Sequence, residues 1–231
     1  MKFSISSQSK ADSIVCFYYQ KGSAKKLTFC SCTDTNIQSN VQKQMDTKSI
    51  NANFSEQLFY RRTDNPACLM VGLGENAKLD AEKIRVLAAN IYSKLEAEKI
   101  SSVSISLEAL PVKDKAMAIQ SLVEGLKLSQ YKFETFKKEA SEYSLDVQFI
   151  SKSSNATLKK ALAEGETVAD GVNFARWLGD CPGNFMTPSQ LAEEAKSAAK
   201  GTKMKVTAWN KAKIAKEKMD SLIGVSNGSV E

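Results

Sequence analysis

The chain has 231 residues, of which 42% are apolar and 25% charged, and its formal net charge is +6. These values are typical of a globular protein with one or two domains, and no apolar run approaches the roughly 18–20 residues that span a bilayer. We therefore expect a cytoplasmic protein with no membrane partner. Histidine is absent, which excludes His-dependent catalytic triads and removes the commonest metal ligand.

The first third of the chain predicts strands. The run "ACLMVGLG" is continuously apolar and ends in Gly72 and Gly74, which is typical of a strand buried on both faces. A turn at Asn65-Pro66 precedes it. Four segments rich in β-branched, aromatic or apolar residues are expected to be strands: 13–20, 26–30, 56–62 and 67–74.

The middle of the chain alternates between helical and strand periodicity. Asp80 is a good helix N-cap, and Leu79 and Ile84 occupy the positions of a hydrophobic staple. The order strand, helix, strand, helix, strand predicts a fold of the α/β class, with a mixed, mostly parallel sheet flanked by helices. The predicted elements are a helix after Asp80, a strand over 101–107, a helix over 113–129, a strand over 145–150 and a long helix through 158–175.

The stretch "FARWLGDCPGNFMTPSQLAEEA" (174–195) predicts a helix end, an elbow and a new helix. Pro182 ends the first helix at or just before Cys181, because proline cannot continue a helix interior. Thr187 is the expected N-cap of the next helix, with Pro188 at its first position and Gln190 completing a capping box.

This corner is interpreted as a joint between two domains. After it, residues 204–209 predict a strand, residues 211–218 a short basic helix and residues 221–230 an apolar strand. The expected organisation is an N-terminal α/β domain over 1–150, a linker helix over 151–181 and the incomplete start of a second α/β domain over 182–231.

The glycine turn "VGLGEN" (71–76) has two interpretations. It could bind phosphate through backbone N–H groups at a helix start. It lacks a third glycine and a Gly-Lys-Ser/Thr sequence, however, and Glu75 and Asp80 would repel an anion. A structural strand-to-helix turn is favoured.

Other reactive residue types favour structural roles as well. An odd number of irregularly spaced cysteines fits reduced thiols; Cys30 and Cys32 lack further zinc ligands, and Cys181 lacks a histidine to activate it. The carboxylate pairs are interpreted as parts of solvated helix faces. The aromatic residues are interpreted as core and sheet packing and not as a surface for stacking nucleic-acid bases. The pairs are Glu96/Glu98, Glu164/Glu166 and Glu193/Glu194; the aromatic residues are Phe17, Tyr18, Tyr19, Phe54, Phe59 and Tyr60.

Four collinear stretches resemble the leucyl (cytosol) aminopeptidase family, the M17 metallopeptidases. They are "VGLGENAKLDAEKIRVLAA" (71–89), "VEGLKLSQYKFETFKK" (123–138), "ARWLGDCPGNFMTPSQLAEEAK" (175–196) and "LIGVSNGS" (222–229). The resemblance implies a macro-domain-like N-terminal domain and a linker helix. It also implies a catalytic domain that uses two divalent metals, zinc, manganese or magnesium, to remove N-terminal residues from peptides.

The family's metal ligands and catalytic residues lie beyond the segment matching 222–229, so we assign no catalytic, cofactor-binding or metal residue to this chain. The resemblance implies a non-catalytic assembly module whose partners are the catalytic domain and further copies in a hexamer. It implies that peptide substrates meet only the catalytic domain. Two alternatives stay open: a free-standing macro-like module that binds a nucleotide or ADP-ribose, and a DNA-binding regulator, which the positive net charge would favour.

Overall fold

The computed structural model describes residues 1–22, 26–30, 34–62, 66–75, 77–139, 142–152 and 155–229. Contacts divide the chain into two compact units, Met1–Asn173 (unit 1) and Phe174–Glu231 (unit 2). The dividing point lies inside one long helix, α4 (Ala156–Asp180). The two units are described separately. The division at 150 and 181 stays a prediction.

Unit 1 contains a mixed, mostly parallel sheet, as predicted. The described strands follow the order β1-β7-β6-β2-β5-β4, and β3 pairs with β2 beside this path. Neighbours from β1 to β5 run parallel, whereas β4 runs antiparallel to β5 and β3 antiparallel to β2. The strands are β1 (Lys2–Ser6), β2 (Ser13–Gln20), β3 (Leu27–Cys30), β4 (Phe54–Tyr60), β5 (Ala67–Glu75), β6 (Ser102–Ser106) and β7 (Asp146–Ile150).

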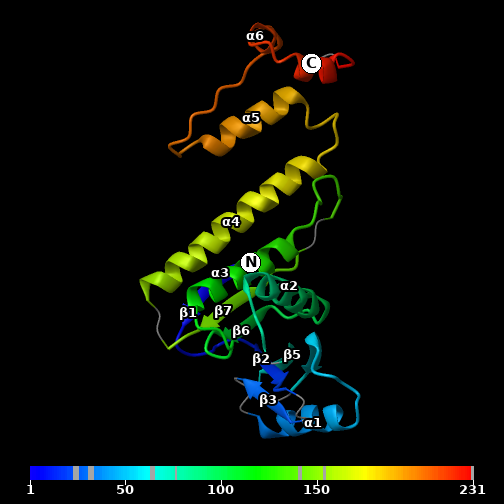
Figure 1. The fold of residues 1–231 in the computed structure, drawn as a ribbon, viewed down its shortest axis with the longest axis vertical. Helices are drawn as coiled ribbons and strands as arrows, with labels where there is room; N and C mark the ends of the chain where they lie inside the picture. Colours follow the sequence, from blue (N-terminus) through cyan, green and yellow to red (C-terminus); the bar gives the residue numbers. More distant parts are fainter. Residues whose placement is uncertain are drawn as a thin grey trace. The chain divides into compact units, whose positions relative to one another are not determined.

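Helices cover both faces of this sheet (Figure 1). Alternate residues of β2 point to opposite sides: Phe17 packs in one core with α2 and α3, and Tyr18 packs in the other with α1. The helices of unit 1 are α1 (Thr35–Asp46), α2 (Ala81–Ala97), α3 (Lys115–Gln130) and the first part of α4.

The periodic segments of the sequence take the predicted structures. Asp80 caps α2, and its side chain accepts a hydrogen bond from the Lys83 backbone N–H at 2.8 Å. The sequence did not predict α1 or β1. Only Ile37 and Val41 are buried in the twelve residues of α1, so its apolar signal is weak.

Two glycines let the helices of unit 1 pack backbone against backbone. A Cβ atom on Gly125 of α3 would lie 2.3 Å from the carbonyl oxygen of Arg85 in α2. One on Gly165 of α4 would lie 2.9 Å from the carbonyl oxygen of Gln120 in α3. Both distances are below van der Waals contact, so α3 is held between α2 and α4 at a spacing that larger side chains would prevent.

Unit 2 corrects two of the predictions. Residues 204–209 form no strand and are exposed, and residues 220–226 form a helix where a strand was predicted. A strand needs a neighbour for its backbone groups, whereas a helix bonds within itself. The helices are the end of α4, α5 (Pro188–Ala199), α6 (Lys211–Lys216) and α7 (Asp220–Ser226); α6 matches the predicted basic helix, and Val230 lies outside the described residues.

The substitution Gly125→Ala is expected to destabilise unit 1 by about 1–3 kcal/mol, because the added methyl group overlaps the Arg85 carbonyl. The matched control is Gly171→Ala in α4, where an added Cβ meets nothing within 4 Å. Alanine there should stabilise the helix by about 1 kcal/mol. Urea denaturation followed by circular dichroism measures both; equal midpoints for the two variants would contradict the close approach of α2 and α3.

Candidate functional site

The glycine turn at the end of β5 is required by packing. A Cβ on Gly72 would lie 2.3 Å from the carbonyl oxygen of Asn53, and Gly74 has a φ of +77°. The Glu56 carboxylate fixes the neighbouring segment, since it accepts hydrogen bonds from the backbone N–H groups of Asn51 (3.2 Å) and Asn53 (3.1 Å). The structure agrees with the structural interpretation of this turn.

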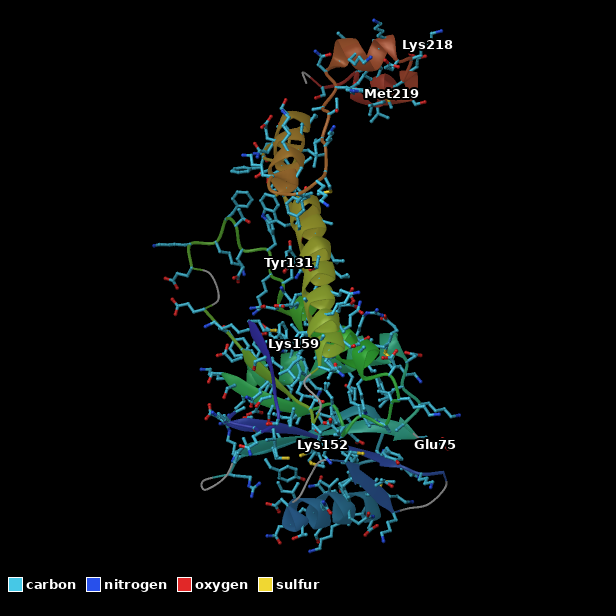
Figure 2. The ribbon with its side chains drawn as sticks, turned by 90° about the vertical axis from the view of Figure 1, so that its left-hand side faces the viewer. Glu75, Tyr131, Lys152, Lys159, Lys218 and Met219 are labelled. Carbon is cyan, nitrogen blue, oxygen red and sulfur yellow. The ribbon has the colours of Figure 1, made fainter. Side chains whose placement is uncertain are left out.

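A crevice of about 460 Å³ opens beside the turn, at the carboxyl ends of the parallel strands β2 and β5. Glu75, labelled in Figure 2, is the last residue of β5 and lines it. None of the described lining residues is basic. They are Gln20, Gly22, Asn51, Ala52, Asn53, Phe54, Gly74 and Glu75.

The stretch 123–138 joins the helices of unit 1. Glu124 is 3% exposed and accepts hydrogen bonds from Arg85 Nε at 2.5 Å and from Gln120 Nε2 at 2.9 Å. The bond to Glu124 raises the pKa of Arg85. Lys127 forms an ion pair of 2.7 Å with Asp170 of α4. Sequence reasoning missed Arg85, because an arginine on a charged helix face gives no signal of its partner.

The residues between α3 and β7 contact α2 and the segment that follows it. Lys132 forms an ion pair of 2.5 Å with Glu96, and the Tyr143 hydroxyl donates to the Ile100 carbonyl at 2.7 Å. The Tyr92 and Tyr143 rings meet edge to face at 5.9 Å. Burial, and then the Glu96 carboxylate, raise the pKa of Tyr92 to about 12. These contacts are structural and leave a cavity of only about 90 Å³.

The elbow of unit 2 forms largely as predicted. α4 ends at Asp180, two residues before Pro182, and the Thr187 hydroxyl accepts from the Gln190 backbone N–H at 3.3 Å. The capping box is incomplete: within the described residues the Gln190 side chain accepts no hydrogen bond from the Thr187 backbone N–H, and its Nε2 donates to Glu194 within the helix. Trp177 is half-buried and its ring stacks on that of Phe174, with the ring centroids 6.2 Å apart.

An apolar groove of about 660 Å³ lies within unit 2, between α5, Trp209 and the helices α6 and α7. In the described part of this unit, no residue of α5, α6 or α7 is buried. Trp209 and Leu222 line the groove and are 46% and 48% exposed, and Val225 of α7, outside the lining, is 87% exposed. A folded domain seldom leaves so many large apolar side chains in water, so this face has the character of an interface.

The thiols of Cys30 and Cys181 show no sign of activation. Burial raises the pKa of the Cys30 thiol, and burial followed by the Asp180 and Glu194 carboxylates raises that of Cys181, so both thiols are protonated near neutral pH. Cys32 lies outside the described residues. Among the described residues, no three or more Cys, Asp or Glu side chains form a group that could hold a metal ion.

The carboxylate pairs and aromatic runs take the structural roles that the sequence favours. Glu96 pairs with Lys132, Glu98 with Lys94, and Glu193 with Lys196, while Phe17 and Tyr18 are fully buried. In the described parts of the chain, we find no helix long and apolar enough to cross a membrane.

The sequence matches two family models. Residues 14–140, more than half of the chain, match the N-terminal domain of the cytosol aminopeptidase family, and residues 173–231 match its catalytic domain. The chain belongs to the cytosol aminopeptidase family. It comprises the N-terminal region of such a protein and the start of the catalytic domain.

Individual relatives agree with this assignment. A probable cytosol aminopeptidase of Bdellovibrio bacteriovorus is 34% identical over 221 residues, which cover 91% of this chain and 44% of that protein. One of Acinetobacter baumannii is 30% identical over 194 residues, which cover 82% of this chain and 39% of that protein. The chain thus spans less than half the length of these relatives.

Solved structures share the fold. A variant of tomato leucine aminopeptidase superposes with a TM-score of 0.69 at 15% identity, covering 86% of this chain and 42% of that one. The bottromycin maturation enzyme BotP superposes with a TM-score of 0.61 at 20% identity, covering 82% and 37%. The likeness confirms the mixed α/β architecture of the family's N-terminal region.

The pair Arg85–Glu124 is expected to contribute roughly 2 kcal/mol of coupling energy, because the carboxylate is buried and the hydrogen bond is charge-assisted. A double-mutant cycle with Arg85→Met and Glu124→Gln measures it through the free energy of unfolding. The exposed pair Lys160–Glu164, at 3.7 Å, is the control and should give less than about 0.5 kcal/mol. A coupling energy no larger than that of the control would show that Glu124 does not join α2 to α3.

Proposed function

We propose that this chain is the non-catalytic N-terminal module of a leucyl aminopeptidase, whose full-length form removes N-terminal residues from peptides. The observation that carries the proposal is the pattern of family matches: the N-terminal model matches over 14–140, whereas the catalytic model matches only over 173–231. The stretches 71–89 and 123–138 support it, since their glycines, ion pairs and hydrogen bonds hold helices and strands together.

Family membership implies divalent metals in the full-length enzyme, and two such ions would supply a Lewis acid and an activated water there. The described residues of this chain do not fit a metal pair, because they offer no group of three or more suitable donors. The metal ligands are therefore proposed to belong to the remainder of the catalytic domain, and no step of hydrolysis is assigned to residues described here.

The apolar groove of unit 2 supports the same proposal. Trp209, Leu222 and Val225 are exposed, and the three short helices around the groove bury none of their residues. The remainder of the catalytic domain is the proposed cover, since this unit matches only the start of that domain.

Unit 1 is proposed to serve folding and assembly, in a macro-domain-like arrangement. Its part of α4 exposes Val168 and Val172, which are one turn apart on the same helix face and 48% and 43% exposed. Such a stripe is suited to burial against another surface. The hexamer implied by the family resemblance is the proposed assembly of the full-length protein in the cytoplasm.

The purified chain of residues 1–231 is expected to hydrolyse no leucine p-nitroanilide above the blank with Mn²⁺, Zn²⁺ or Mg²⁺ present, because its described residues offer no donor cluster of the kind that a dimetal centre requires. An authentic leucyl aminopeptidase in the same assay is the positive control. Equilibrium dialysis of the chain against Mn²⁺ and Zn²⁺ provides a second readout and should detect no stoichiometric, tightly bound ion.

Turnover that a chelator abolishes, or a stoichiometric metal held by the chain, would overturn the non-catalytic assignment. The coding sequence gives an independent test. The proposal expects the reading frame to continue beyond the codon for Glu231 into the rest of a catalytic domain, and a stop codon at that point would contradict it.

A further inference from the structure

Residues 204–209 of unit 2 have the sequence pattern of a strand but no partner strand in the described part of the chain. Figure 1 shows this segment within the orange trace that leads into α6, and it contains no turn or bend. Every one of its residues is exposed, and among the described residues the backbone groups of 205–209 make no hydrogen bond. A row of unpaired N–H and C=O groups is the template on which another strand can add.

The segment also has an apolar side that lies in water. Alternate residues of a strand point in opposite directions, so Met204, Val206 and Ala208 share one side of it. Met204 is 62% exposed and Val206 is 40% exposed. Pairing with a second strand of the same kind would bring two such apolar sides together on one face of a ribbon, where cross-strand contacts stabilise the pair.

We propose that this segment pairs with the same segment of a second copy of the chain. The two strands run antiparallel, and a two-fold axis passes between the two copies of Val206, which makes the contact isologous. In this register Met204 of one copy lies opposite Ala208 of the other, and Lys205 lies opposite Thr207. No lysine of the segment then lies opposite a lysine.

Charge favours this register over its neighbours. A parallel pair in register would place each Lys205 beside its own copy, and so would an antiparallel pair centred on Lys205. An antiparallel pair centred on Thr207 would bring Lys203 opposite Lys211. Because like charges directly opposite each other destabilise a strand pair, the register centred on Val206 is preferred. The same lysines disfavour the stacking of further copies, as charged residues do on natural edge strands.

The expected dimer is weak, since one short strand buries little surface, and a Kd on the order of 0.1 mM is appropriate to such a contact. The proposal concerns the chain of 231 residues by itself. In the full-length protein, the remainder of the catalytic domain is the proposed cover of unit 2 and would compete with the second copy. The pairing does not depend on the peptidase assignment, because its argument uses only residues 203–211.

Analytical ultracentrifugation of the purified chain over a range of concentrations tests the proposal and should show a monomer–dimer equilibrium. Val206→Lys would place two lysines opposite each other on the axis and should weaken the dimer about 10-fold. Thr207→Glu would place a carboxylate opposite Lys205 twice in each dimer. It should tighten the dimer about 5-fold, because each cross-strand pair of opposite charges is stabilising.

Two variants are matched controls. Val225→Lys also replaces an exposed valine of unit 2, but in α7 and outside the segment, and should leave the dimer unchanged. Ala208→Glu adds the same charge as Thr207→Glu, but opposite Met204, and should not tighten the dimer. Circular dichroism checks that every variant folds.

Three results would overturn the proposal. The first is a folded chain that stays monomeric at several times the expected Kd. The second is a Val225→Lys variant that weakens the dimer as much as Val206→Lys does, which would assign the association to the apolar groove. The third is a Thr207→Glu variant that dimerises no more tightly than Ala208→Glu, which would exclude the register centred on Val206.

Discussion

The structure of unit 1 depends on the close approach of α2 and α3 at Gly125. With no side chain at this position, the α3 backbone reaches the Arg85 carbonyl of α2, and the adjacent Glu124 reaches the side chain of the same arginine. Two adjacent residues thus fix how α2 and α3 pack. The contact at Gly125 sets the distance between the helices, and the ion pair of Glu124 with Arg85 sets their alignment along each other. α4 then packs on the other side of α3 through Gly165, and Lys127 and Asp170 link the two helices by an ion pair.

A second close approach shapes the sheet at the carboxyl ends of β2 and β5. The Asn53 carbonyl lies where a side chain on Gly72 would be, so the segment leading into β4 rests directly on β5. This contact fixes residues 51–54 against the ends of β2 and β5 and leaves the crevice between them. Gly72 and Gly74, which the sequence presents as a candidate phosphate loop, are therefore needed for packing beside this crevice.

The sequence predicts those parts of the fold whose signals are local. The β-branched and aromatic residues of β2, the continuous apolar run of β5 and the cap at Asp80 each reflect short-range requirements, and each predicted element is present. The partners of Arg85 and Gly72 could not be predicted, because they come from segments distant in the sequence and depend on packing. α1 was missed for a related reason: one pair of buried residues, Ile37 and Val41, gives too weak a period.

The errors in unit 2 have a different physical origin. Residues 204–209 alternate as a strand does, but a strand can satisfy its backbone only beside another strand, and the described part of unit 2 contains none. Residues 220–226 satisfy theirs by forming α7, which leaves Leu222 and Val225 in water. An apolar pattern in the sequence is typical of a segment that is buried in the complete protein. The exposed apolar side chains of α7 and the strand-like pattern of residues 204–209, which have no partner strand here, both support the proposal that the rest of a catalytic domain covers this surface.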